Sequence, residues 1–115
     1  MSGFSEISPE TVRQWLQAGE AVAVDVREQP ELAEARLENA VHVPMSAFDP
    51  ALIPTDGAKK VVFVCAQGAR SEQVGMYVVA EGILKEAYNM AGGLMAWAEA
   101  GLPLVLGEPP ADPQP

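Results

Sequence analysis

The sequence is poor in the residue types that form disulfides and metal sites. Among its 115 residues it has one cysteine, Cys65, and one histidine, His42. A single cysteine cannot form an internal disulfide, which favours a reducing, cytoplasmic setting. One cysteine and one histidine are also too few for a zinc site of the usual kind. The chain has no Gly-x-Gly-x-x-Gly or P-loop pattern for a nucleotide either, so we expect no cofactor.

Positive charge and long apolar runs are scarce as well. The chain has 7 Lys and Arg against 16 Asp and Glu, which gives a formal net charge of −9. It therefore lacks the basic face that nucleic acid requires, and its charge disfavours anionic membranes. No stretch approaches the ~20 unbroken apolar residues of a membrane span, and no secretory signal is visible at the N-terminus. A small anionic substrate would be repelled by this charge unless local donors bind it.

The sequence does contain enough apolar residues for one hydrophobic core. They make up 49% of the chain, which suits one domain over residues 1–106. Trp15, Tyr77 and Trp97 are expected in its core. The tail at 107–115 is rich in proline and in small or acidic residues, so we expect it to be disordered.

The spacing of the apolar residues predicts helices and strands in alternation. Ser8 and Pro9 are typical of a helix start, and Gly19 is expected to end that helix. Short apolar runs predict strands at residues 21–26, 40–43, 60–64 and 87–90. Further helices are predicted at residues 30–35, 48–53, 71–81 and 94–98, with a turn at 55–57.

This alternation indicates an α/β domain with a largely parallel sheet and helices on both faces. In such sheets ligands bind beyond the carboxyl ends of the strands. Asp25 and Cys65 both fall at the ends of predicted strands. We therefore expect a common site where these two strands end.

Cys65 opens a segment that is typical of an anion-binding loop. The segment joins a predicted strand to a predicted helix and reads Cys65-Ala66-Gln67-Gly68-Ala69-Arg70-Ser71. Its free backbone N–H groups favour an anion, its glycine lets the chain curl, and its arginine adds a fixed positive charge. We therefore expect a reactive thiolate here, whereas the commonest role of a lone cysteine is that of an inert core residue.

The loop resembles the active-site loop of single-domain rhodaneses, which are sulfurtransferases. The resemblance covers about residues 4–105. Its other segments follow the family's order and spacing: Ser8-Pro9-Glu10, Asp25-Val26-Arg27-Glu28, Ala40-Val41-His42-Val43-Pro44, and Tyr88-Asn89-Met90-Ala91-Gly92-Gly93 with Trp97, Gly101, Leu102 and Pro103. The resemblance implies a three-layer α/β domain with a largely parallel central sheet.

One segment departs from the family pattern. Before the third strand the family usually shows Gly-His-Ile-Pro-Gly-Ala, whereas this chain reads Ala35-Arg36-Leu37-Glu38-Asn39-Ala40. Asn39 tolerates a left-handed conformation better than most residues, so the turn can survive. Arg36 replaces a titratable group with a permanent charge.

The resemblance also implies a mechanism in which Cys65 is the nucleophile. The Cys65 thiolate takes a sulfur from a donor such as thiosulfate or a persulfide and passes it to cyanide or a thiol, with a protein sulfur partner as a further option. Loop donors from Ala66 to Ser71 stabilise the sulfur anion, so no general base is needed. Arg70 is expected to clamp the sulfonate of thiosulfate rather than to pair with a carboxylate such as Glu72 or Glu81.

The remaining charged residues near these segments are assigned supporting roles. Asp25 and Arg27 are expected to hold the loop rim through an ion pair or backbone hydrogen bonds. Arg36 could help to offset the repulsion of an anionic donor. His42 is expected to be a strand residue without a chemical role. Gly92-Gly93 could cradle a phosphate, but a helix start after a tight turn is favoured.

Two other functions remain open at this point. A domain of the same fold could act as a sulfur carrier or binding module, in which Cys65 receives sulfur from a partner without turnover. A small cysteine phosphatase or arsenate reductase is disfavoured by loop length. Phosphatases place five residues between nucleophile and arginine, whereas four separate Cys65 from Arg70. The smaller ring of donors suits one sulfur atom better than a phosphoryl group.

Overall fold

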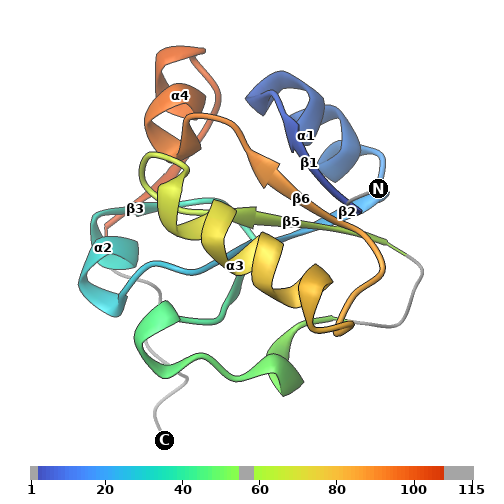
Figure 1. The fold of residues 1–115 in the computed structure, drawn as a ribbon. Helices are drawn as coiled ribbons and strands as arrows, with labels where there is room; N and C mark the ends of the chain where they lie inside the picture. The colour runs from blue at the N-terminus through green and yellow to red at the C-terminus, as the bar shows by residue number, and fades with distance from the viewer. Residues whose placement is uncertain (1–2, 55–58, 108–115) are drawn as a thin grey trace, which may run out of the picture.

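A computed structural model describes residues 3–54 and 59–107, and its centre is a five-stranded parallel sheet (Figure 1). The strand order is β1-β6-β5-β2-β4, and each pair of neighbours runs parallel. The strands are β1 (Phe4–Ile7), β2 (Ala21–Asp25), β4 (Val41–His42), β5 (Lys60–Val64) and β6 (Ala87–Met90). The valine-rich runs therefore form the central strands β2 and β5, as parallel sheets require.

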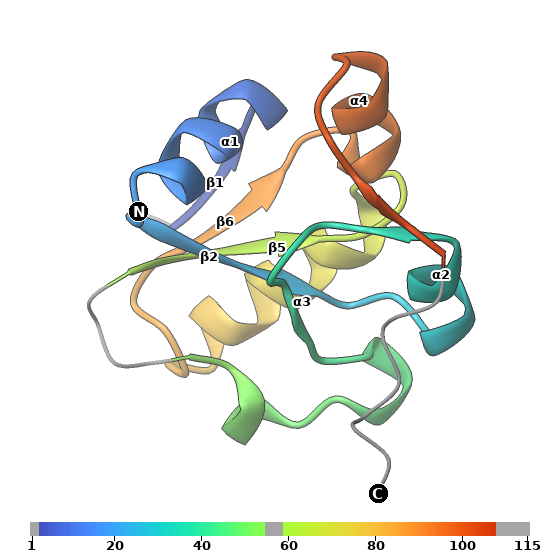
Figure 2. The same cartoon turned by 180° about the vertical axis from the view of Figure 1, so that it is seen from behind.

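Helices cover both faces of this sheet (Figures 1 and 2). They are α1 (Pro9–Gln17), α2 (Gln29–Glu34), α3 (Ala69–Ala80) and α4 (Gly93–Glu99). One face packs against α1 and α4 through a core that includes Val12, Leu94 and Trp97. The other face packs against α3 through Val74 and Val78. The predicted three-layer α/β architecture is thus confirmed.

Side chains of β5 alternate between the two cores. Val62 and Val64 pack on the α1 and α4 side, whereas Val61, Phe63 and Cys65 belong to the core on the α3 side. This alternation follows from the two-residue period of a strand. The cysteine is consequently buried, with 1% of its surface exposed.

Several element boundaries differ from the sequence-based expectation. Strand β1 was not predicted, and it pairs with β6 at the edge of the sheet. A short antiparallel pair, β3 (Ala35–Arg36) with β7 (Val105–Leu106), was not predicted either. The helix expected at 48–53 is absent from the described residues; two 3-10 turns, Met45–Ala47 and Pro50–Leu52, stand near it. Pro50 begins the second turn, and Asp49 caps it with a side-chain bond to the Ala51 N–H.

The expectation for the three aromatic residues was right only in part. Trp97 is buried in the core. Trp15 is half-buried and packs edge-on against Tyr88. Tyr77 is 50% exposed, so its assignment to the core was wrong. It lies beside the buried stripe of α3 and contacts Phe48 edge-on instead.

Two expectations fall on residues outside the description. The turn at 55–57 belongs to this group, and so does all of the proline-rich tail beyond Gly107. Among the helices in the described ranges, none is long and apolar enough to cross a membrane.

Candidate active site

The carboxyl ends of β2 and β5 lie next to each other, as expected for a common site. Asp25 is paired with Val64 in the parallel register, and the Val26 N–H donates to the Val64 carbonyl at 3.0 Å. Cys65 follows directly after β5. The chain then turns through Gly68, which has a left-handed φ of 97°, into α3. The helix begins at Ala69, two residues earlier than predicted, so Arg70 and Ser71 lie in its first turn.

The sulfur of Cys65 accepts several hydrogen bonds from its own loop. The backbone N–H of Gly68 donates to Sγ at 3.1 Å and that of Ser71 at 3.4 Å. The Ser71 hydroxyl lies 3.2 Å from Sγ. All three groups lie at or near the N-terminus of α3, where the helix dipole favours negative charge. We call these donors, Gly68 N, Ser71 N and Ser71 Oγ, the sulfur cradle.

Burial and hydrogen bonds shift the pKa of Cys65 in opposite directions. Burial raises the pKa of the thiol, because it disfavours the charged form. The hydrogen bonds from Ser71, Gly68 and the backbone of Gln67 act against burial and outweigh it. The net effect is a pKa below the ordinary value of a cysteine. The site therefore raises the fraction of thiolate, the nucleophilic form of sulfur, above that of an unperturbed cysteine.

Two buried polar side chains, Ser71 and Asn89, and the exposed Glu6 form a line of hydrogen bonds behind the cradle. The Ser71 hydroxyl lies 2.5 Å from Asn89 Oδ1, in addition to its contact with the sulfur. Asn89 Nδ2 donates to the Gly68 carbonyl at 3.0 Å and to both carboxylate oxygens of Glu6 at 3.0 and 3.1 Å. Because its amide donors are engaged with oxygens, Asn89 presents its oxygen to Ser71, so the single hydroxyl proton of Ser71 is shared between Asn89 Oδ1 and Cys65 Sγ. The side chain of Ser71 is thereby fixed beside the thiolate.

Helix α4 holds the first half of the loop. The backbone N–H groups of Leu94 and Met95 donate to the carbonyls of Cys65 and Ala66, both at 2.9 Å. This approach requires Gly93, which has a φ of +66°. A Cβ atom on that residue would lie 2.5 Å from the Cys65 carbonyl oxygen. The segment Gly92-Gly93 is thus a helix start after a tight turn, as favoured from the sequence.

Arg70 makes a bidentate ion pair with Glu31 of α2. Its Nη1 and Nη2 lie 2.9 and 2.8 Å from the two carboxylate oxygens. This geometry holds the pKa of Glu31 at about 2, and it raises that of Arg70 above its already high value. Both side chains are about one-third exposed, so the pair lies at the rim of the site. We call it the rim pair; Glu31 was not singled out from the sequence.

The expected ion pair between Asp25 and Arg27 is present and buried. Arg27 Nη2 lies 2.9 Å from Asp25 Oδ2, and both side chains are less than one-tenth exposed. Arg27 also donates to the backbone carbonyls of Glu31 and Ala35, at 3.4 and 2.7 Å. The ion pair therefore anchors α2, the helix that carries Glu31. His42 lies in β4 as expected, with Nε2 2.7 Å from the Arg27 carbonyl.

Arg36 is not brought to the loop. Its Nη1 donates to the carbonyl of Gly107 at 2.7 Å and to that of Leu32 at 3.4 Å. It thus ties α2 and β3 to the end of β7. The left-handed conformation expected at Asn39 is present, with a φ of 64°.

The loop encloses one side of an open pocket of about 270 Å³. Its lining residues all come from the loop: Cys65, Ala66, Gln67, Ala69 and Arg70. The only formal charges among them are the thiolate and the guanidinium of Arg70. The pocket adjoins Cys65 on this side, where 1% of the residue is exposed.

The residues that the sequence analysis missed share one property. Glu6, Glu31 and Asn89 act through partners far along the chain: Glu31 is 39 residues from Arg70, and Asn89 is 18 from Ser71. Asn89 lies within a segment noted for its resemblance to rhodaneses, which was the one available signal. Helical or strand periodicity gives no sign of such pairs.

Comparison with known proteins gives a consistent picture. The family model described as Rhodanese-like domain matches residues 8–100. A protein named sulfurtransferase from Allochromatium vinosum is 34% identical over 105 residues, which is 90% of this chain and 97% of the relative. The thiosulfate sulfurtransferase GlpE of Glaesserella parasuis is 29% identical over 104 residues, 90% of this chain and 95% of the relative.

Solved structures with the same fold include another sulfurtransferase. The polysulfide-sulfur transferase homodimer of Wolinella succinogenes superposes with a TM-score of 0.72 at 29% identity. The match covers 90% of this chain and 79% of that chain. The cysteine loop therefore lies in a fold that other proteins with sulfur-transfer names share.

Proposed function

This chain belongs to the rhodanese-like domain family, and on that premise we propose that it is a sulfurtransferase that carries sulfur as a persulfide on Cys65. The observation that carries the proposal is the sulfur cradle. Its hydrogen bonds hold the pKa of Cys65 below the ordinary value of a cysteine. The same donors can stabilise the outer sulfur of a persulfide, which is also an anion.

In the first step the Cys65 thiolate attacks the outer sulfur of the donor. With thiosulfate, a new S–S bond forms to Cys65 as the S–S bond of thiosulfate breaks. The electron pair of the broken bond leaves with sulfite, and the outer sulfur remains on Cys65 as a persulfide anion. No proton moves, so the reaction requires only a nucleophile and a site for negative charge.

In the second step an acceptor removes the outer sulfur. Cyanide attacks it through carbon and leaves as thiocyanate, or a thiolate attacks it and leaves as a new persulfide. The electrons of the Cys65 S–S bond return to Cys65 as thiolate. We assign Cys65 as the catalytic residue and the segment Ala66, Gln67, Gly68, Ala69, Arg70 and Ser71 as the substrate-binding loop. Asp25 and Arg27 act as supporting residues, because their ion pair positions α2.

The proposed donors are thiosulfate or a persulfide, and the proposed acceptors are cyanide or a thiol. The name of the GlpE relative supports thiosulfate, and that of the Wolinella protein supports a polysulfide. We place the reaction in the cytoplasm, because a lone cysteine that must return to its thiolate suits a reducing compartment.

Turnover of thiosulfate with cyanide tests this function directly. Wild type is expected to form thiocyanate, and Cys65→Ser is expected to lose all activity above background, because a hydroxyl cannot carry sulfane sulfur. Glu34→Gln, at an exposed position of α2 outside the loop, is the matched control and should retain activity. A Cys65→Ser enzyme with undiminished turnover would refute the proposal.

The same protein samples separate the alternatives. A sulfur carrier would gain the mass of one sulfur on incubation with a persulfide donor, without turning over. A phosphatase would hydrolyse an aryl phosphate. Since Cys65 is the only cysteine, any added sulfur that reductant removes can be assigned to one side chain.

A further inference from the structure

The rim pair leaves the pocket without a free positive charge. Arg70 is the only cationic residue that lines the pocket, and both of its terminal nitrogens bond to Glu31. The guanidinium of Arg70 could bind two oxygens of a sulfonate in the same bidentate geometry. A sulfonate and the Glu31 carboxylate therefore compete for the same two nitrogen donors.

The other charged groups near the pocket do not favour the binding of a dianion either. From the sheet to the sulfur, the groups alternate in sign: Asp25, Arg27, Glu31, Arg70 and the Cys65 thiolate. Three negative groups thus face two positive ones when the cysteine is ionised. The chain as a whole carries a net charge of −9. A dianion that enters the pocket is therefore repelled by its close neighbours and by the distant field.

A donor with less charge and no sulfonate meets a lower barrier. The reacting end of an organic persulfide carries one negative charge at most, as R–S–S⁻, and none in its protonated form R–S–SH. The Cys65 thiolate attacks the terminal sulfur of R–S–SH, a new S–S bond to Cys65 forms, and the S–S bond of the donor breaks. The electron pair leaves with the thiolate RS⁻, and the proton of the transferred sulfur passes to solvent, which leaves the persulfide anion on Cys65. This reaction needs the sulfur cradle but does not need Arg70.

We infer that Glu31 is a specificity-determining residue that, by occupying Arg70, directs the site toward organic persulfides and away from thiosulfate. The inference rests on the proposed function and names the donor class of that same site. Glu31 belongs to α2 and is held there by a further bond, since the Glu28 N–H donates to its Oε2 at 3.0 Å. The carboxylate is thus fixed at the rim by its own helix as well as by Arg70.

The test compares two donors on four variants. The rate of sulfur addition to Cys65 is followed by intact mass, with thiosulfate or with the persulfide of 2-mercaptoethanol, whose organic part is uncharged. Glu31→Gln keeps an oxygen for Arg70 and for the Glu28 N–H but removes the charge. It is expected to raise the thiosulfate rate constant about fivefold, the upper range for one partly exposed ion pair, and to change the persulfide rate less than twofold.

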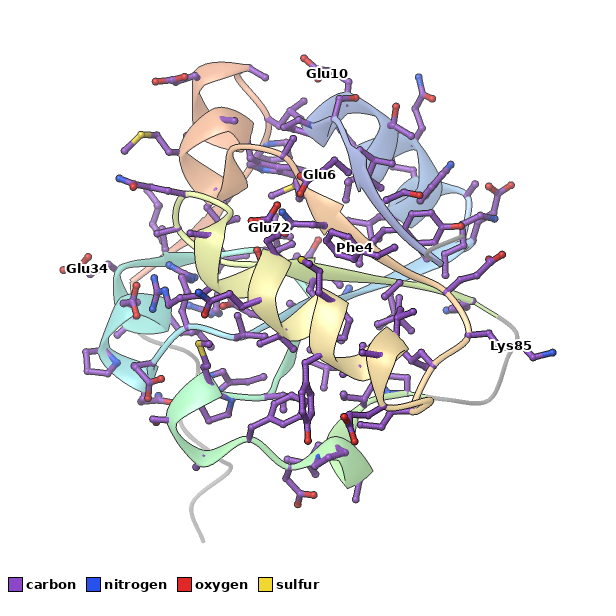
Figure 3. All side chains as sticks on the ribbon, viewed as in Figure 1. Phe4, Glu6, Glu10, Glu34, Glu72 and Lys85 are labelled. Atoms are coloured by element: carbon purple, nitrogen blue, oxygen red, sulfur yellow. The ribbon has the colours of Figure 1, made fainter. Side chains whose placement is uncertain are left out.

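Glu34→Gln is the matched control. Glu34 lies on the same helix, is exposed, and extends away from the domain at the left of Figure 3. Its substitution removes an equal charge without touching Arg70, so neither rate should change more than about twofold. When Glu31→Gln is added to Arg70→Ala, the thiosulfate rate constant should change no more than it does in Glu34→Gln, because there is no guanidinium left to compete for.

The outcomes separate the two proposals. If Glu31→Gln and Glu34→Gln change the ratio of the two rates alike, Glu31 has no special role and the inference is overturned. If neither donor loads Cys65 in any variant, the proposed function fails and the inference with it. Should Glu31→Gln fail to fold, Glu31→Asp, which draws the charge back from Arg70, is expected to give a smaller rise in the same direction; a fall would overturn the inference.

Discussion

The sulfur cradle and the rim pair interact with negative charge in different ways. At the cradle, Cys65 and Ser71 are buried, and the sulfur is surrounded by neutral dipoles. At the rim, Arg70 and Glu31 are partly exposed and carry full charges that compensate each other. Only four residues of chain separate Cys65, which receives the sulfur anion, from Arg70, whose positive charge is already engaged.

Because of this difference, the cradle is expected to activate the nucleophile and the rim pair to select the donor. Buried dipoles lower the pKa of the thiol, because they are fixed and water does not screen them. Exposed charges act on whatever approaches the pocket and are weakened by solvent and salt. Changes in the cradle should therefore alter the nucleophile, while changes at the rim should alter the choice of donor.

The largest effect is expected from a change that displaces the cradle. Gly93→Ala would place a Cβ atom 2.5 Å from the Cys65 carbonyl and force a left-handed alanine. Strain and overpacking together should lower the free energy of unfolding by about 3 kcal/mol. Activity should fall with both donors, because α4 holds the first half of the loop. Urea denaturation and the loading rates measure the two effects.

Gly101→Ala is the matched control for that variant. Gly101 has a similar φ of +76°, but a Cβ atom there would meet nothing within 4 Å. Its substitution should cost only the conformational term, about 1 kcal/mol, and leave loading rates unchanged. Equal losses in the two variants would show that the close approach of α4 to the loop is unimportant.

A smaller effect, confined to the nucleophile, is expected from Ser71→Ala. The variant keeps the Ser71 N–H but removes the hydroxyl, so the pKa of Cys65 should rise. Since only the thiolate reacts, the rate of alkylation by iodoacetamide should reach its plateau at a higher pH than in wild type. Asn89 Oδ1 also loses its donor, which should lower the free energy of unfolding by about 1 to 3 kcal/mol.

Ser71→Thr keeps the hydroxyl and should restore the wild-type pH profile. The ratio of thiosulfate to persulfide loading should stay the same in both Ser71 variants. A profile that does not move in Ser71→Ala would mean that the backbone N–H groups of the loop alone lower the pKa of Cys65.

The smallest effect is expected from Arg70→Ala at the rim. Because Glu31 already occupies this guanidinium, its loss should weaken the apparent affinity for thiosulfate only about two- to fivefold. Added salt should affect thiosulfate turnover modestly or favourably, since it screens the acidic surface. The pH profile of alkylation should move less than in Ser71→Ala. An unchanged affinity for thiosulfate would show that Arg70 does not contact this donor.

Much of the site could be anticipated because its residues are close together in the chain. The valine-rich runs at 21–26 and 60–64 predict buried parallel strands, whose ends meet at Asp25 and Cys65. The loop from Cys65 to Ser71 contains its own donors, so local sequence is enough to predict an anion site. The buried ion pair of Arg27 with Asp25 is also local, since a single residue lies between the partners.

The rest depends on packing between distant segments. Which carboxylate meets Arg70 is decided by the place of α2. The sequence favoured substrate contact for Arg70 over pairing with a carboxylate such as Glu72 or Glu81, whereas in the structure Arg70 pairs with Glu31. Strand β1 has four residues with a half-buried pattern at a sheet edge, too short and too polar to predict from periodicity. Tyr77 follows the spacing of the buried stripe of α3, but it lies at the border of the stripe and its ring remains half in solvent.

The contact between Glu6 and Asn89 links the edge of the sheet to the nucleophile. Glu6 belongs to β1, and its label stands near β6 in Figure 3. Through Asn89 and Ser71 it completes a chain of hydrogen bonds that ends at the sulfur. Fraying of that peripheral strand would loosen Asn89 and then the thiolate. The labelling kinetics of a single thiol can consequently report whether a segment some sixty residues earlier in the chain is docked.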